Sequence, residues 1–195
     1  MTHNGELYRI ILADPPWHFQ NWNGKPGELT PGQQRRGNAQ SHYATMSQAE
    51  ICNLKIPAYE NSVLFVWACW PLLPEAMQAI AAWGFQYKTL AWVWVKLNPS
   101  SVGFHFGMGY YTRANSEPCL LAMRGHVPKP KARDVQALIC SSVREHSRKP
   151  DEQYAKIERL YPEGPYLEMF ARRKRDGWSA WGNEIENDIE IPARP

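Results

Sequence analysis

The chain has 195 residues, of which 44% are hydrophobic and 21% are charged, so it can bury the core of one soluble globular domain. Its four cysteines form no C-x-x-C pair and its histidines show no metal-ligand spacing, which argues against a zinc site, any other metal centre or a disulfide framework. The formal net charge of +3 is mildly basic, which is compatible with a nucleic-acid partner but does not require one.

The N-terminal residues MTHNGELYR lack the charged and then apolar layout of a signal peptide. No apolar stretch of the sequence reaches the length that is needed to cross a membrane. We therefore expect a cytoplasmic protein that has no membrane partner.

Five apolar runs predict the strands of a central sheet. In chain order they span Tyr8–Ala13, Val63–Ala68, Thr89–Val95, Pro118–Met123 and Tyr166–Ala171. Several of these runs are apolar on both faces, which is typical of central strands in a mostly parallel sheet that helices cover on both sides.

Two helical patterns lie between the predicted strands. Residues 73–84 carry apolar residues at helical spacing, and Gly84 suits the position just after a helix end. In residues 147–164, Pro150 is placed for the first helical turn. Strands that alternate with helices predict an α/β fold with a doubly wound sheet. Three residues of the second helix are predicted to face the core: Ile157, Leu160 and Tyr161.

The remaining segments are polar. Residues 18–42 are rich in Gly, Gln and Asn, and residues 124–147 are basic and contain two prolines, so both are predicted to be long loops. The acidic residues from about residue 185 predict a polar C-terminal tail. All of these segments belong to a single predicted domain over residues 1–195.

The residues D-P-P-W, Asp14 to Trp17, follow the first predicted strand, and ligands of open α/β sheets bind beyond such strand ends. The two prolines fix the backbone and remove two N–H donors. The turn therefore presents rigid acceptors, namely the Asp14 carboxylate and the carbonyls of Asp14 and Pro15. Such acceptors would orient the exocyclic amine of a nucleobase, on which Trp17 could stack. Taken alone, the four residues equally fit a structural turn in which Asp14 caps a helix.

Six motifs in this order together resemble the MT-A70 family of S-adenosylmethionine-dependent adenine-N6 methyltransferases, in its short bacterial and phage form. They are D-P-P-W, HYATMS (42–47), LFVWA (64–68), HSRKPDEQY (146–154), YLEMFARR (166–173) and GWSAWGNE (177–184). The resemblance covers about residues 8–184. It implies a Rossmann-like methyltransferase fold in permuted order, in which the catalytic motif precedes the cofactor strand.

The resemblance also implies roles for single residues. The catalytic motif is matched by Asp14, Pro15, Pro16 and Trp17. Contacts to the cofactor, S-adenosylmethionine, are expected from Ala13, Lys149, Phe170, Arg172 and Asn183. Residues near the target base are expected at Tyr43, Trp67 and Glu117.

Two further groups of residues are candidates for contact with the substrate. Tyr110 and Arg113 belong to FHFGMGYYTR (104–113), which fits either the base pocket or a flexible loop on the core. A methyltransferase of this kind needs a salt-dependent grip on the nucleic-acid backbone. For that grip we expect Arg35, Arg36, Arg124, Lys129, Lys131 and Arg133.

The leading hypothesis is a DNA adenine-N6 methyltransferase, which must flip its target base out of a duplex. The same chemistry on RNA or on single strands stays open, because the base pocket would be the same. A catalytically silent nucleic-acid-binding subunit is a second alternative, although such members of the family typically lose D-P-P-W. A general nucleotide-binding module is a third alternative. We expect a homodimer, because methyltransferases with this motif order are often dimers.

Overall fold

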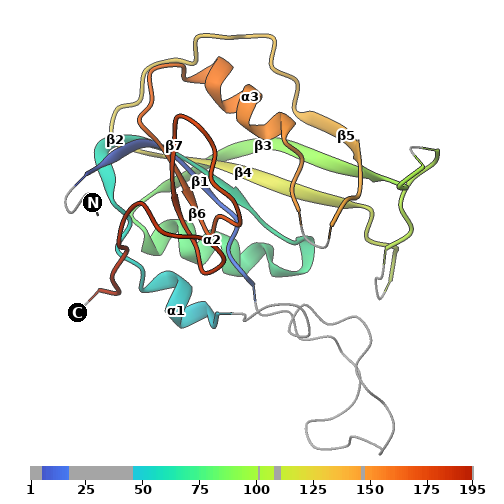
Figure 1. Cartoon of the computed structure of the whole chain (residues 1–195), viewed down its shortest axis with the longest axis horizontal. Helices are drawn as coiled ribbons and strands as arrows, with labels where there is room; N and C mark the ends of the chain where they lie inside the picture. The colour runs from blue at the N-terminus through green and yellow to red at the C-terminus, as the bar shows by residue number, and fades with distance from the viewer. Residues whose placement is uncertain (1–5, 18–45, 101, 108–110, 146–147, 195) are drawn as a thin grey trace, which may run out of the picture.

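The structure is a computed structural model, and it describes residues 6–17, 46–100, 102–107, 111–145 and 148–194. Within these ranges the chain forms one seven-stranded sheet with the strand order β5-β3-β4-β2-β1-β6-β7 (Figure 1). The strands are β1 (Tyr8–Ala13), β2 (Ala58–Trp67), β3 (Gln86–Leu97), β4 (Ser116–Arg124), β5 (Leu138–Ser142), β6 (Tyr166–Met169) and β7 (Trp178–Trp181).

The strands of this sheet are mostly parallel. β1 pairs in parallel with β2 and β6, β6 with β7, and β3 with β5, whereas β4 runs antiparallel to both β2 and β3. The parallel strands therefore end at one edge of the sheet, which we call the carboxyl edge, while β4 begins there and ends at the opposite, amino edge. This arrangement confirms the Rossmann-like α/β class with the D-P-P-W motif ahead of the later strands.

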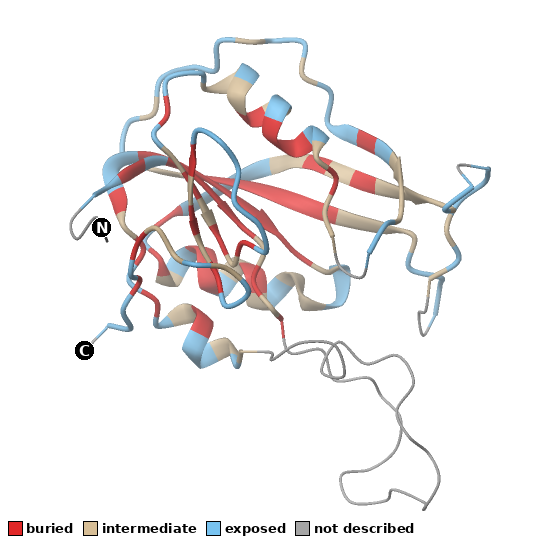
Figure 2. Cartoon of the chain, viewed as in Figure 1, coloured by how far each residue is buried: buried red, intermediate tan, exposed pale blue. Residues whose placement is uncertain are grey.

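Helices cover both faces of the sheet (Figures 1 and 2). One face carries α1 (Gln48–Cys52), the short 3₁₀ helix η2 (Trp70–Leu72) and α2 (Leu73–Ala82), and the other carries α3 (Glu152–Leu160). Neighbouring strand residues point to opposite faces. The buried Leu64 therefore packs in the α1–α2 core, and the buried Phe65 packs on the α3 side. None of the helices in the described ranges is long and apolar enough to cross a bilayer.

The apolar runs predicted the five central strands, with differences only at their ends. β1 has the predicted bounds, whereas β6 ends at Met169 because the next residue, Phe170, adopts a positive φ of 63°. Gly84 follows the end of α2 with a φ of 82°, as expected. Pro150, however, precedes the N-cap residue Asp151 of α3 and lies outside the first helical turn, so its predicted position is wrong.

Two predicted polar segments are different in the structure. The predicted loop over 124–147 contains β5, which pairs in parallel with β3 and extends the sheet. The segment after residue 185 is packed rather than a free polar tail, because Ile189 and Ile191 are buried in the core. The Asp188 carboxylate also accepts the Ala180 N–H at 2.9 Å. The predicted loop over 18–42 lies outside the described residues.

Replacing Ile189 by Ala should lower the free energy of unfolding by about 2–5 kcal/mol, because the side chain is 3% exposed and its removal leaves a cavity. The neighbouring exposed residue Glu190 is the control, and Glu190→Ala should change that free energy by less than about 0.5 kcal/mol. Urea denaturation of both variants measures the difference, and equal losses would contradict a packed C-terminal segment.

Candidate functional site

The D-P-P-W turn is fixed by backbone hydrogen bonds immediately after β1. The Trp17 N–H donates to the Pro15 carbonyl at 2.8 Å, and the Met46 N–H donates to the Pro16 carbonyl at 3.1 Å. Because prolines lack N–H groups, the turn offers its carbonyls and the Asp14 carboxylate as acceptors. The turn therefore holds acceptors at the carboxyl edge, as its sequence predicts.

The Trp17 ring anchors this turn to β2. Its side chain is buried in the α1–α2 core with 7% exposure, and its indole N–H donates to the Trp67 carbonyl oxygen at 3.0 Å. A buried ring has no free face for a base. The predicted stacking of Trp17 on the target base is therefore wrong. Trp17 instead holds the turn in place against the end of β2.

A partly buried ion pair joins the turn to the segment before α3. The Lys149 ammonium lies 2.8 Å from both carboxylate oxygens of Asp14, and the two side chains are 12% and 30% exposed. The ammonium also lies 5.6 Å from the centre of the Trp67 ring. Trp67 is 1% exposed and donates its indole N–H to Gln153 at 2.6 Å. Trp67 thus contacts Lys149 with its ring and, although almost fully buried, also borders the cavity that opens beside Asp14.

The same ammonium contacts a second carboxylate. Lys149 lies 3.4 Å from Glu117 on β4, and the other Glu117 oxygen binds the ammonium of Lys96 on β3. The register of β3 and β4 pairs Trp94 with Glu117, which sets these side chains together at the carboxyl edge. Four charges of alternating sign therefore run from Asp14 through Lys149 and Glu117 to Lys96.

Burial and the neighbouring charges shift the pKa values of these side chains in opposite directions. Burial raises the pKa of Asp14 above its usual value, and the attraction of Lys149 offsets only part of that rise. Burial also acts to raise the pKa of Glu117, but Lys149 and Lys96 together outweigh it and leave that pKa lowered. Burial acts to lower the pKa of Lys149, yet the two carboxylates raise it above its ordinary range. Lys149 therefore stays charged at neutral pH.

A cavity of about 280 Å³ opens beside Asp14 at the carboxyl edge, close to the lower limit of small-molecule sites. Among the described residues, no group of His, Cys, Asp and Glu is placed to hold a metal ion. The lining combines carboxylates, guanidinium groups and rings. It includes Leu12, Asp14, Trp67, Lys149, Gln153, Tyr154, Glu168, Phe170, Arg172, Arg173 and Glu184.

Sequence reasoning missed Glu168, which lies on β6 and lines this cavity. Its carboxylate accepts the Tyr154 hydroxyl at 3.0 and 3.1 Å, and burial raises the pKa of Glu168 to about 7. The available signal was a single acidic residue within the apolar run YLEMF, because a carboxylate in a central strand needs a partner or a ligand.

The backbone is strained where β6 meets the cavity. Phe170 adopts a φ of 63°, which is uncommon for a non-glycine residue, and its ring packs edge-on against Trp181 at 5.3 Å. The following Ala171 N–H donates to the Trp181 carbonyl at 2.9 Å. A Cβ atom at Gly182 would overlap the Ala171 carbonyl oxygen, so the close crossing of the two segments requires glycine.

The structure brings together only part of the predicted cofactor set. Lys149, Phe170 and Arg172 line the cavity beside Asp14. Arg172 also lies 3.4 Å from Glu184 at the rim. Two further predicted residues do not line it: Ala13 is buried at the end of β1, and Asn183 is exposed next to Glu184.

Of the residues predicted near the base, Tyr43 and Tyr110 lie outside the described residues. Arg113 lies between β3 and β4, where its guanidinium group stacks over the exposed Phe106 ring at 4.8 Å. This connection leaves the sheet at the carboxyl edge, because β3 ends and β4 begins there. Of the set, Glu117 is joined to Asp14 through Lys149.

The basic residues that were predicted to bind the nucleic-acid backbone are not brought together at the carboxyl edge. Arg124 pairs with Ser62, five residues before Trp67 on β2 and therefore about 17 Å from the carboxyl edge. Lys129 and Lys131 line a separate cavity of about 390 Å³ at the amino edge. The reason is the reversed direction of β4, which carries the residues after it away from Asp14. Arg133 follows exposed in the same connection, and Arg35 and Arg36 lie outside the described residues.

Comparison with known proteins relates this chain to methyltransferases. The family model MT-A70 matches residues 8–184. The type II methyltransferase M.MunI of Mycoplasma sp is 32% identical, over 96% of this chain and 82% of the relative. The N(6)-adenosine-methyltransferase MT-A70-like protein of Arabidopsis thaliana is 27% identical, over 91% of this chain and 24% of the relative. The human N(6)-adenosine-methyltransferase catalytic subunit METTL3 is 26% identical, over 96% and 30% respectively, so this chain spans under a third of the two eukaryotic relatives.

Replacing Lys149 by Met should cost about 3 kcal/mol of folding stability at pH 8, because Asp14 and Glu117 lose their shared ammonium. The raised pKa of Lys149 keeps its own contribution constant from pH 5 to 8, since that contribution is lost only as the pH rises through the folded-state value. The unpaired carboxylates take up protons as the pH falls, so the loss should shrink at pH 5.

Urea denaturation of wild type and variant at pH 5 and pH 8 measures this dependence. Lys131→Met is the matched control, because that ammonium is 66% exposed and lies 3.7 Å from Glu163, and it should change stability by less than about 1 kcal/mol. An equal loss for Lys149→Met at both pH values would contradict the electrostatic role of Lys149.

Proposed function

This chain belongs to the MT-A70 family of S-adenosylmethionine-dependent methyltransferases, and we propose that it methylates N6 of adenine in DNA. The observation that carries the proposal is the position of Asp14, which directly follows β1 as the first residue of the D-P-P-W turn and also lines the cavity of about 280 Å³. The Asp14 carboxylate would therefore meet the amine of the base next to a cavity that would hold the methyl donor.

The residues of the cavity fit S-adenosylmethionine by their chemistry. Glu168 and Asp14 supply negative charge for a ligand that carries a sulfonium and an ammonium group. Arg172 is a guanidinium donor suited to ribose hydroxyls or to a carboxylate, and Phe170 contributes an aromatic face. When bound, the cofactor supplies a methyl group on a positively charged sulfur.

The residues of the turn would orient the amine and stabilise its developing charge. The exocyclic nitrogen of adenine has two N–H donors, and the Asp14 carboxylate and a turn carbonyl accept them. This orientation would leave the nitrogen lone pair available for the methyl group that the bound cofactor would supply, and the acceptors would stabilise the positive charge that develops on the nitrogen. Acceptors that are already fixed near this nitrogen lower the activation barrier, because the protein does not have to reorganise during the reaction. Lys149 holds the Asp14 carboxylate in place, and the products are N6-methyladenine, the demethylated cofactor and one proton.

The choice of DNA rests on similarity to the type II methyltransferase M.MunI. Similarity to N(6)-adenosine-methyltransferases supports RNA as the alternative substrate. A silent binding subunit is disfavoured because this chain keeps both D-P-P-W and the cavity beside it. The homodimer and the cytoplasmic location stay predictions.

Methyl transfer from labelled S-adenosylmethionine should place label in N6-methyladenine of duplex DNA, and Asp14→Ala should lower kcat by about 10²-fold or more. Duplex DNA, single-stranded DNA and RNA of the same sequence are tested in parallel. Glu163→Ala is the control, because this carboxylate is 77% exposed at the amino edge. Label that appears only in RNA or in single strands would reject the DNA substrate, and label that persists in Asp14→Ala would reject the catalytic role of Asp14.

Cofactor binding should strengthen as the pH rises from 6 to 8. The pKa of Glu168 is raised to about 7 by burial, so its negative charge, which attracts the cationic ligand, is gained across this range. The Kd for S-adenosylmethionine, measured by equilibrium dialysis, should fall by up to about tenfold. Glu168→Gln should remove this dependence. A steep dependence that survives in Glu168→Gln would show that another group controls binding.

A further inference from the structure

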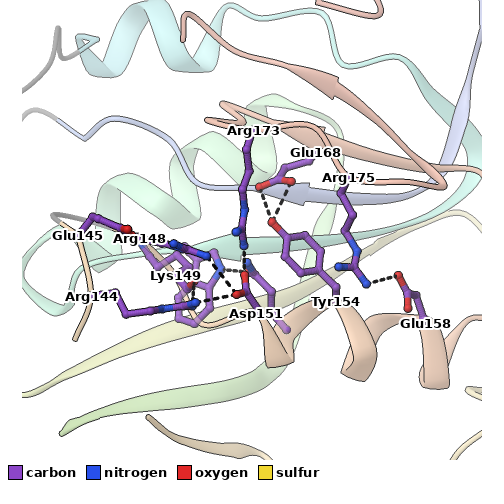
Figure 3. A network of polar contacts seen from close by, with 12 residues as sticks. Arg144, Glu145, Arg148, Lys149, Asp151, Tyr154, Glu158, Glu168, Arg173 and Arg175 are labelled. Atoms are coloured by element: carbon purple, nitrogen blue, oxygen red, sulfur yellow. Dashed lines mark hydrogen bonds and ion pairs between the residues drawn. The ribbon is translucent and has the colours of Figure 1, made fainter. Parts of the chain in front are cut away.

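Three arginines converge on one carboxylate at the carboxyl edge (Figure 3). Asp151 accepts Arg144 at 2.6 Å and Arg148 at 3.3 Å through one oxygen, and it binds Arg173 through the other. Arg144 and Arg148 lie between β5 and α3, whereas Arg173 follows β6, so the contact joins segments that are distant in the sequence. We call Arg144, Arg148 and Arg173 the arginine cluster.

The arginine cluster has more donors and more positive charge than its partners satisfy. Besides Asp151, the contacting carboxylate is Glu145, which lies 2.8 Å from Arg148. Each guanidinium group has five N–H donors, and the Arg148 Nε atom is buried without a hydrogen-bond partner in the described part of the chain. Burial lowers the pKa of Arg173, and repulsion from Arg148 and Arg144 lowers it further. An anion would relieve this repulsion and take up the remaining donors.

The arginine cluster lies directly beside the proposed site of methyl transfer. Arg148 precedes Lys149 in the chain, and Arg144 donates to the Lys149 carbonyl oxygen at 3.0 Å. Arg148 and Arg173 line the same cavity as Asp14. The side chains of Arg144, Arg148 and Arg173 are 33%, 30% and 46% exposed, so all three reach solvent at this edge.

We propose that the arginine cluster binds a phosphate of the nucleic-acid backbone beside the target nucleotide. The planar guanidinium fork matches a phosphate with two parallel hydrogen bonds, and phosphate contacts set the register of a nucleic acid on a protein. A base that enters the site keeps its own phosphates at the rim, where the cluster lies. The inference rests on the proposed function for its substrate class, and it moves the phosphate grip from the amino edge, where Lys129 and Lys131 lie, to the carboxyl edge.

Salt dependence of DNA binding tests the inference. The Kd of a fluorescently labelled duplex DNA is measured by anisotropy over a series of salt concentrations, with S-adenosylhomocysteine present. The double variant Arg144→Gln/Arg173→Gln should reduce the slope of log K against log salt by about one for each phosphate that the protein no longer neutralises. Lys129→Gln/Lys131→Gln removes the same formal charge at the amino edge and is the matched control, which should keep the wild-type slope.

A conservative variant separates loss of charge from loss of structure. Arg144→Lys/Arg173→Lys keeps both charges but cannot form the planar fork, so it should keep the wild-type slope and still bind DNA more weakly. Thermal unfolding of each variant shows whether it is folded.

Three results would overturn the inference. They are a wild-type slope in the folded Arg144→Gln/Arg173→Gln variant, an equal loss of slope in the Lys129→Gln/Lys131→Gln control, and a loss of S-adenosylhomocysteine affinity without any loss of DNA affinity. The last result would assign the arginine cluster to the carboxylate of the cofactor. Failure of the proposed function is distinguishable, because it appears as absent methyl transfer while the change in slope remains.

Discussion

The contact on which the site depends is the one between the Lys149 ammonium and two partly buried carboxylates, Asp14 and Glu117. Asp14 directly follows β1 and Glu117 lies on β4, and the sheet places these two strands on either side of β2. Two carboxylates so close together would repel each other and bind protons, and the ammonium between them opposes both effects. The charge of Asp14, on which the proposed chemistry relies, is therefore set by a residue 135 positions away in the sequence.

The sequence alone was sufficient to predict the central strands of the sheet, but it did not predict the two outer strands, β5 and β7. β1, β2 and β4 contain stretches that are buried on both faces, so their sequences include continuous apolar runs that predict strands directly. β5 and β7 are short edge strands with mixed burial, LICSS and WSAW, and such sequences do not differ clearly from loops. The C-terminal segment was wrongly predicted to be a polar tail for a related reason, because its two buried isoleucines lie among acidic residues.

The candidate site was also predictable from the sequence only in part. The D-P-P-W turn could be placed from the sequence, because a strand end and two prolines determine its position and its acceptors. The burial of the Trp17 ring could not, because it depends on how β2 and α1 pack around it. The position of Lys129 and Lys131 depended on the direction of β4, and an apolar run is the same in either direction. Glu168 required the structure to show that its carboxylate lines a cavity.

The hydrogen bond from Met46 to Pro16 has a consequence for how this protein can diversify. Together with the bridge between Trp17 and Met46, it fixes both ends of the segment 18–45 at the base of the turn. The entropic cost of closing a loop grows slowly with its length, by about 0.6 kcal/mol for each doubling. Insertions and deletions between these two anchors should therefore change the position of Asp14 very little. The length of this segment can therefore differ between relatives while the chemistry at Asp14 stays constant, and an engineer could shorten or extend it for the same reason.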